Sequence, residues 1–310
     1  MKKKAEQKNI IGGQALIEGI YMRGPKKGCV AVRKPDGDIF TETEDISVHP
    51  LRKVPFLRGA VLMVDNLVKG YKSIMKSADI AFEEEEASYG GADEWISKKL
   101  GDKGFSAAAT VAAVLGGLFS IVLFLIAPTF IVGFIDGFFP LGGFKALAEG
   151  ILKILIFIGY LFLVTRIKDI RRVFEYHGAE HKAIACYEAK NELTAENVRL
   201  CSRFHPRCGT SFLFLVVIIS IAIFSFVPFA NTLARAGVKL LLIPVIMGIA
   251  YEVTRYAGMY GNRLSSALSA PGLWVQRLTT FEPDDSQIEV AIAAIKMVIP
   301  QHETADDAAL

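Results

Sequence analysis

The sequence lacks the signals that identify many soluble enzymes and nucleic-acid-binding proteins. Its formal net charge is only +3, so the composition indicates no basic surface for nucleic acid. The glycines between Gly12 and Gly24 match neither GxGxxG nor GxxxxGK, so they predict structural turns rather than a phosphate-binding loop. No apolar segment follows the lysine-rich N-terminus at signal-peptide distance, so we expect no secretory signal.

Cysteine is scarce, and its spacing contains no CxxC pair. The four cysteines are Cys29, Cys186, Cys201 and Cys208. This pattern is typical of a protein in a reducing compartment, and we expect no disulfide bond.

Charge is absent from two long stretches of the chain. No charged residue lies between Lys103 and Asp136 or within residues 211–233, and each stretch exceeds the ~20 residues that a membrane-spanning helix needs. Pro128 is expected to kink or end the first helix. Runs of this length rarely occur in a soluble core, so the alternative of buried helices in a large soluble domain is disfavoured.

Two shorter apolar segments, 146–165 and 239–253, complete a set of four. Lys153 in the first of these can pair with Glu149 one turn earlier. The sequence therefore predicts an α-helical multi-pass membrane protein with about four transmembrane helices, a small β-containing N-terminal cytoplasmic region and cytoplasmic helices.

Basic residues cluster at one end of each apolar segment. They are Lys98, Lys99 and Lys103, then Arg166, Lys168, Arg171 and Arg172, then Arg199, Arg203 and Arg207, and finally Arg255 and Arg263. Under the positive-inside rule, both termini and the central segment 166–210 are therefore cytoplasmic.

The predicted organisation alternates cytoplasmic and membrane parts. It comprises a β-rich region (1–58), an amphipathic helix and linker (59–103), transmembrane helices 1–2 (104–165), a His-rich cytoplasmic segment (166–210), transmembrane helices 3–4 (211–257) and a C-terminal helical region with a tail (258–310). A hairpin turn is expected at residues 35–37. The helix over 59–82 either lies along the inner leaflet or packs on the protein. Ser286 and Glu289 have capping-box spacing before the last helix.

The segment 166–210 carries the pattern that could support chemistry. If it is helical, His177 and His181 lie on one face, with Glu180 at its edge. Two imidazoles one turn apart can bind one metal ion, and a neighbouring carboxylate can act as a base. The order HxxEH is that of inverted zincins.

A second motif, with His205 and Cys208, lies at the foot of the third predicted span. Because the second and third spans are consecutive, both motifs approach the same membrane face, and a shared site can form. The predicted metal ligands are His177, His181, His205 and Cys208. The alternative is that these residues are hydrogen-bonded packing groups, and Glu252 is expected to form an interfacial ion pair or to act as a further ligand. His49 is expected in a surface loop and His302 in an uninvolved tail.

The motifs together resemble the YqhQ-like bacterial membrane proteins, a family of unknown function whose members are described as predicted metal-dependent enzymes. The resemblance rests on segments that span almost the whole chain, at residues 12–25, 55–59, 177–182, 205–211, 251–255, 271–280 and 282–290. It implies a bacterial plasma (inner) membrane location, and His177, Glu180, His181, His205 and Cys208 match the family's motif residues.

Two hypotheses about function follow. The first is a membrane-bound metal-dependent enzyme, most plausibly a hydrolase, which acts at the cytoplasmic membrane face with Glu180 as base and a divalent ion such as Zn²⁺ as cofactor. The second is a non-enzymatic assembly or scaffold protein, in which the β region, the 59–82 helix and residues 271–280 dock a membrane protein partner. The lipid bilayer is a partner in both, and a transporter is disfavoured by the few charges within the spans.

Overall fold

The computed structural model describes residues 11–46, 54, 57–82, 110–226, 232–260 and 262–299. They group into two compact units, and each unit collects segments that are distant in sequence. The first unit contains described residues from 11–81, 161–216 and 244–299, and the second contains those from 82–160 and 217–243. The linker part of 59–103, from residue 83 onward, lies outside the described residues, as do His49 and His302.

The first unit is built on an antiparallel sheet in the order β1 (Gly12–Leu16), β2 (Gly19–Arg23), β3 (Lys27–Arg33) and β4 (Ile39–Asp45). The β3–β4 turn confirms the predicted hairpin. Its Gly37 has a φ of +91°, a conformation that glycine adopts without steric cost. The Lys34 amide donates to the Asp38 carbonyl at 2.8 Å and closes the turn.

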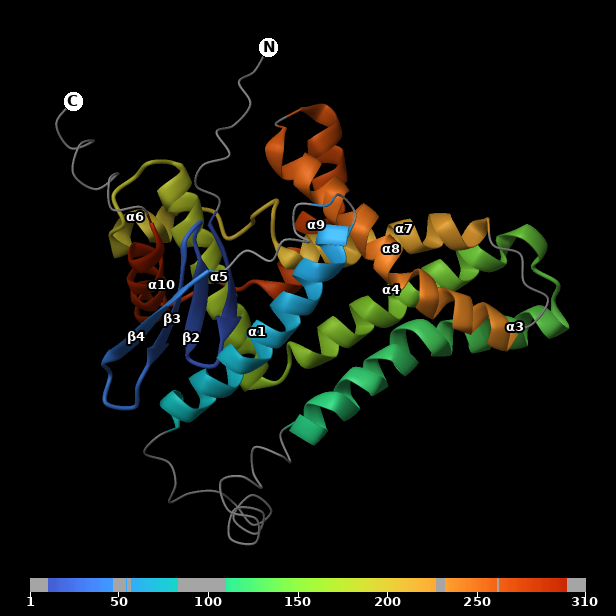
Figure 1. The fold of residues 1–310 in the computed structure, drawn as a ribbon, viewed down its shortest axis with the longest axis horizontal. Coiled ribbons are helices and arrows are strands. Elements are labelled where there is room, and N and C mark those ends of the chain that lie inside the picture. Colours follow the sequence, from blue (N-terminus) through green and yellow to red (C-terminus); the bar gives the residue numbers. More distant parts are fainter. Residues whose placement is uncertain are drawn as a thin grey trace, which may run out of the picture. The chain divides into compact units, whose positions relative to one another are not determined.

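Helices cover both faces of this sheet (Figure 1). Side chains alternate in direction along a strand, so neighbouring residues join different cores. On one face, Leu16 and Val32 pack with Ala81 at the end of α1 (Leu57–Ala81), which confirms the predicted 59–82 helix. On the other face, Ile20 and Met22 pack with α5 (Lys168–Glu188), α6 (Ala195–Leu200) and α10 (Asp285–Val298).

The N-terminus of α10 corrects the predicted capping box. Asp284, not Ser286, is the capping residue, and its carboxylate accepts a hydrogen bond from the Gln287 amide at 2.9 Å. The Gln287 side chain in turn accepts from the Asp284 amide. Glu289 is free of this role and pairs with Arg33 of β3 at 2.8 Å. The capping box therefore forms between Asp284 and Gln287, at the same three-residue spacing expected for Ser286 and Glu289.

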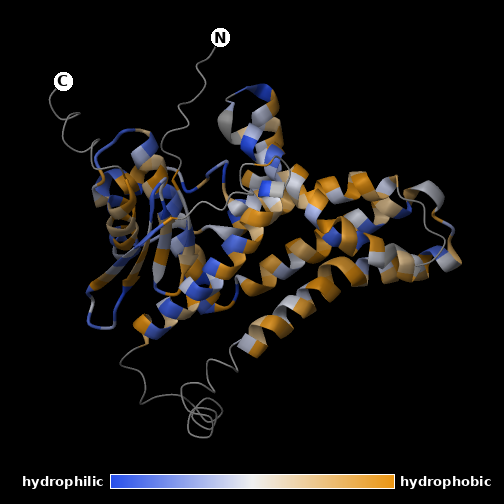
Figure 2. Cartoon of the chain, viewed as in Figure 1, coloured by the Kyte–Doolittle hydropathy of each residue, from blue (hydrophilic) through white to orange (hydrophobic). Residues whose placement is uncertain are grey.

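Three helical stretches in the described part of the chain are long and apolar enough to cross a membrane: Thr110–Phe138, Gly142–Val164 and Gly237–Ala257. They coincide with the first, second and fourth predicted spans, and Figure 2 shows their apolar colouring. They include α3 (Ala127–Phe138), the 3-10 turn η4 (Gly142–Phe144), α4 (Lys145–Val164) and most of α8 (Thr232–Met259).

The third predicted span, 211–233, is shorter than expected. Its helix, α7 (Gly209–Ser225), has 17 residues and ends before Pro228. At 1.5 Å per residue this length is about 25 Å, less than the ~30 Å hydrocarbon core of a bilayer. The residues before a proline disfavour helical conformation, which the uncharged stretch alone does not reveal.

Pro128 does not end the first helix, which continues to Phe138. The π-helical turn η3 (Val122–Ile126) comes just before it. Proline has no N–H to donate and its ring crowds the carbonyl four residues earlier, so a wider turn accommodates it within the helix.

The second unit buries charged groups among these apolar helices. Lys239, rather than Lys153, contacts the Glu149 carboxylate, and Lys239 Nζ also donates to Thr129 Oγ1 at 2.7 Å. The Lys153 ammonium lies 5.7 Å from the centroid of the Phe224 ring. The predicted Glu149–Lys153 pair is therefore replaced by a longer-range pair between α4 and α8.

Candidate metal centre

The helix α5 carries three of the predicted site residues. It begins after Ile167, whose extended backbone separates it from α4, and Asp169 in its first turn suits the positive end of the helix dipole. The i, i+3, i+4 spacing brings His177, Glu180 and His181 to adjoining positions on the helix. His181 and Glu180 are buried, whereas His177 is partly exposed.

Cys208, just before α7, meets the two α5 histidines. The ligand atoms of His177, His181 and Cys208 all lie within 4.8 Å of one another. His177 Nε2 is 3.2 Å from Cys208 Sγ, and the two imidazole centroids are 4.4 Å apart. The structure thus brings three of the four predicted ligands into one group.

Both imidazoles are oriented by backbone carbonyl groups. His177 Nδ1 lies 2.7 Å from the Thr279 carbonyl oxygen, and His181 Nδ1 lies 2.6 Å from that of Arg203. A carbonyl only accepts, so each Nδ1 carries the proton and each Nε2 keeps its lone pair. His177 Nε2 faces Cys208, and the His181 side chain also hydrogen-bonds Cys208. This is the arrangement that fixes the tautomer of metal-binding histidines.

Burial sets the charge state of the histidines. It lowers the pKa of His181 and that of His205, because a low-dielectric environment disfavours the protonated ring. His181 is therefore neutral at neutral pH, the form in which imidazole binds metals.

The Glu180 carboxyl lies beside the group and is 4% exposed. Burial raises its pKa, because a low-dielectric environment disfavours the ionised carboxylate. The Gly13 backbone of β1 hydrogen-bonds the carboxyl, yet Oε2 has no hydrogen-bonding partner among the described residues. A buried carboxyl with an open oxygen and a raised pKa is suited to proton transfer.

His205, the fourth predicted ligand, lies next to the group but outside it. Its ring centroid is 5.6 Å from that of His181. Its Nε2 lies 3.5 Å from Glu188 Oε2 and 3.3 Å from an Arg207 nitrogen. His205 therefore borders the site and faces the ion pair between Glu188 and Arg207.

The helix α9 (Arg263–Thr279) supplies residues that the sequence did not assign to the site. Gln276 is fully buried and holds the main chain of His205 from both sides, accepting from its amide at 2.8 Å and donating to its carbonyl at 2.7 Å. Just beyond α9, the Phe281 carbonyl packs directly on Gly178, where any Cβ would collide with it. The sequence gives no signal of this role, because Gln276 stands between Val275 and Arg277 in an ordinary helical pattern.

Two residues of the segment 271–280 therefore contact the histidines: the Thr279 carbonyl faces His177 Nδ1, and the Gln276 side chain holds the His205 main chain. Glu252, in contrast, is engaged elsewhere. It forms a bidentate pair with Arg58 of α1, in which Arg58 Nε lies 2.6 Å from Glu252 Oε1. The ion pair expected for Glu252 is therefore present, with Arg58 as its partner.

The donor set fits a metal ion. Two Nε2 lone pairs and one sulfur converge, Nδ1 protons are committed to carbonyls, and Glu180 keeps an open buried oxygen at the edge. The fold and this group together define a largely helical protein with apolar helices of membrane-crossing length and a His–His–Cys group of which His181 and Cys208 are buried. All members of the group lie in its first unit.

The chain belongs to the family described as proteins of unknown function (DUF1385), whose profile matches residues 54–301. It is 33% identical over 305 residues to a protein of Bacillus subtilis (strain 168) described as "Uncharacterized protein YqhQ", covering 93% of this chain and 92% of that protein. The family resemblance read from the motifs is thereby confirmed. No solved structure matches the chain.

Proposed function

We propose that the protein is a membrane-bound, metal-dependent hydrolase whose site faces the cytoplasm. The observation that carries this proposal is the orientation of the two histidines. Each Nδ1 is held by a carbonyl while Cys208 approaches the opposite edge of the rings, beside the buried Glu180 carboxyl. Packing alone does not require two adjacent histidines to share this arrangement.

His177, His181 and Cys208 would hold the ion, and a three-ligand set leaves room for a substrate atom. The cation would supply Lewis acidity and stabilise developing negative charge. Glu180, with its raised pKa and open Oε2, would take a proton from the attacking group and return it to the leaving group. The carbonyls of Thr279 and Arg203 would keep both rings aligned during this step.

A sulfur ligand beside two imidazoles favours Zn²⁺ over Mg²⁺ or Ca²⁺, which prefer oxygen. The membrane part of the proposal is supported by the three apolar stretches and by the basic residues at one end of each predicted span. In the proposed topology, four helices span the plasma membrane of a bacterial cell, the shortest being α7. Both termini lie in the cytoplasm. The substrate would be a lipid-linked molecule or a membrane-proximal peptide, reached at the inner leaflet.

Metal content tests the proposal. Protein purified without chelators or a polyhistidine tag should contain about one zinc per chain, and the His177→Ala/His181→Ala variant little. Cys208→Ser should weaken metal retention, whereas Cys201→Ser should leave it unchanged. Wild-type protein with less than about 0.1 metal per chain would overturn the metal centre.

Glu180→Gln separates binding from chemistry. It should retain zinc yet lose hydrolytic turnover when wild-type and variant membranes are compared against ester, phosphodiester and peptide substrates. Equal turnover in the two preparations would remove Glu180 from the mechanism.

A scaffold role is the second candidate, and one contact favours it. His177 Nε2 and Cys208 Sγ are 3.2 Å apart, a hydrogen bond that closes the group without any ion. A His177→Ala/His181→Ala variant that fails to bind metal but fully replaces the wild-type gene in cells would favour this role over the enzyme.

A further inference from the structure

The helix α1 presents three chemically different faces. At 100° per residue, its small residues, its lysines and its large apolar residues fall on separate sides. Two of these faces have partners in the first unit. The third face packs on none of the described residues of that unit.

The small-residue face packs on the sheet. A Cβ on Gly70 would lie 3.0 Å from the Gln14 side chain, and Ser77 Oγ accepts a hydrogen bond from the Ile17 amide at 3.2 Å. The buried Ser73 lies on the same side. Small side chains allow this close approach, so the sheet fixes the rotation of α1 about its own axis.

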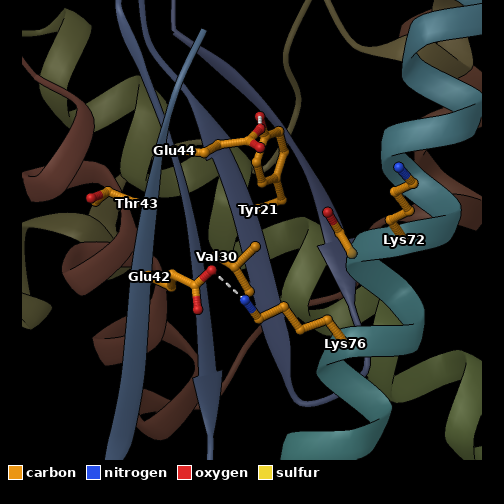
Figure 3. A pocket seen from close by; sticks show the side chains of 8 residues that line it. Tyr21, Val30, Glu42, Thr43, Glu44, Lys72 and Lys76 are labelled. Carbon is orange, nitrogen blue, oxygen red and sulfur yellow. Dashed lines mark hydrogen bonds and ion pairs between the residues drawn. The ribbon is translucent and has the colours of Figure 1, made fainter.

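Two of the three lysines on the lysine face, Lys69 and Lys76, pair with glutamates of β4. Lys76 pairs with Glu42, and Lys69 Nζ lies 3.5 Å from Glu44 Oε1. Figure 3 shows the Lys76–Glu42 pair in the small pocket between α1 and the sheet. These lysines are therefore directed to the protein's own glutamates.

The third face is an exposed apolar stripe. Its members are Val64, Leu67, Val68 and Ile74, with exposed fractions of 61%, 61%, 51% and 42%. Val64, Leu67 and Val68 have i, i+3, i+4 spacing, and Ile74 follows Leu67 by seven residues, so all four lie on one side of the helix. A contiguous apolar stripe of this kind marks an interaction surface.

The start of α1 is docked on an apolar helix of membrane-crossing length. A Cβ on Gly59 would lie 2.8 Å from Tyr251 Cβ and 3.0 Å from Gly248 Cα. Both residues belong to the Gly237–Ala257 stretch of α8. The Arg58–Glu252 pair fixes the same junction. The helix that carries the apolar stripe therefore starts next to an apolar helix that would contact lipid.

We propose that the apolar stripe of α1 lies in the bilayer surface and holds the first unit, which contains the sheet, against the inner leaflet. The docking is apolar rather than electrostatic, because the lysines nearest the sheet are already paired. It rests only on the membrane part of the proposed function and is independent of metal binding.

Photo-crosslinking from defined positions tests this contact in the full chain. Leu67→p-benzoylphenylalanine, in nanodiscs of phosphatidylethanolamine and phosphatidylglycerol, should give lipid adducts by mass spectrometry. Asn66→p-benzoylphenylalanine, exposed next to Leu67 but turned away from the stripe, should give several-fold fewer. The Leu67 yield should not fall at an ionic strength of about 1 M, where charge contacts are screened within ~3 Å.

A third position distinguishes this inference from membrane insertion itself. Phe134, 70% exposed on the Thr110–Phe138 stretch, should also give lipid adducts when replaced by p-benzoylphenylalanine. Lipid adducts at Phe134 but not at Leu67 would overturn the docking of α1 alone. Their absence at both would overturn the membrane assignment as well. A crosslink from Leu67 to a second copy of the chain would assign the stripe to an oligomer instead.

Discussion

Gly12 and Gly13 are adjacent in β1, but their surroundings differ. A Cβ on Gly13 would lie 2.5 Å from the Tyr21 carbonyl oxygen and 3.1 Å from Glu180 Oε1, whereas none of the described atoms lies within 4 Å of one on Gly12. We predict that Gly13→Ala lowers the free energy of unfolding by about 1–3 kcal/mol. Gly12→Ala should change it by less than about 0.5 kcal/mol. Thermal unfolding in detergent compares them, and equal melting temperatures would contradict the close approach.

The buried Glu180 carboxyl makes the stability of the folded protein depend on pH. Because its pKa is raised in the folded protein, the unfolded chain releases this proton first as the pH rises above about 4.3, and folding loses stability above that value. Glu180→Gln removes the carboxyl. We predict that the variant matches the wild type at acidic pH and is more stable at pH 8, measured on metal-free protein. A variant less stable than the wild type at pH 8 would show that burial of the ionised Glu180 carboxylate does not destabilise the folded protein.

The side chains that meet in the site could be predicted from the sequence, through helical spacing and the order of the apolar segments, but the backbone groups that orient them could not. His177, Glu180 and His181 share adjoining positions because helical spacing is a local property. Their orientation depends on the Thr279 and Arg203 carbonyls, which are 102 and 22 residues away along the chain from the histidines that they contact. A backbone carbonyl has no sequence signature, so only the fold reveals these partners.

At the scale of helices, the Lys239–Glu149 pair joins α8 to α4. Both side chains are buried, with 3% and 5% exposed. We predict that Lys239→Met lowers the free energy of unfolding by about 3–5 kcal/mol, because it strands a buried carboxylate. The double variant Lys239→Met/Glu149→Met should recover most of that loss.

The more exposed pair Lys145–Asp136 is the matched control. Lys145→Met should cost less than about 1 kcal/mol, since partly exposed pairs contribute little. Unfolding of the wild type and the three variants in detergent gives these differences. Similar losses for Lys239→Met and Lys145→Met would show that burial does not govern these pairs.

Periodicity predicted the existence of most helices but not the details of their ends. The apolar spacing indicated α1 and α10, and the lack of charge indicated the long apolar stretches. The cap at Asp284 was missed because two overlapping segments both satisfy the spacing rule. The end of α7 at Ser225 was missed because hydropathy does not register how proline restricts its neighbours.

For the whole molecule, the proposed topology makes a direct prediction. Alkaline phosphatase folds to an active enzyme only outside the cytoplasm. Fused after Leu141, between α3 and α4, it should therefore be active. Fused after Lys190, at the end of α5, or at the C-terminus, it should be inactive, and green fluorescent protein should give the opposite pattern. Activity at Lys190 would invert the orientation and move the metal group to the other side of the membrane.

The contact between β3 and α10 sets the order in which the molecule can be completed. Arg33 donates to the Ser286 carbonyl at 2.7 Å, across 253 residues of chain. During synthesis, the strands emerge first, and the apolar stretches follow before α10 exists. The part of this sheet face that packs on α10 therefore stays exposed until the last helix has been made, although α5 and α6 can already cover the rest. A chain truncated before residue 284 lacks α10, so the sheet residues that α10 covers would remain exposed.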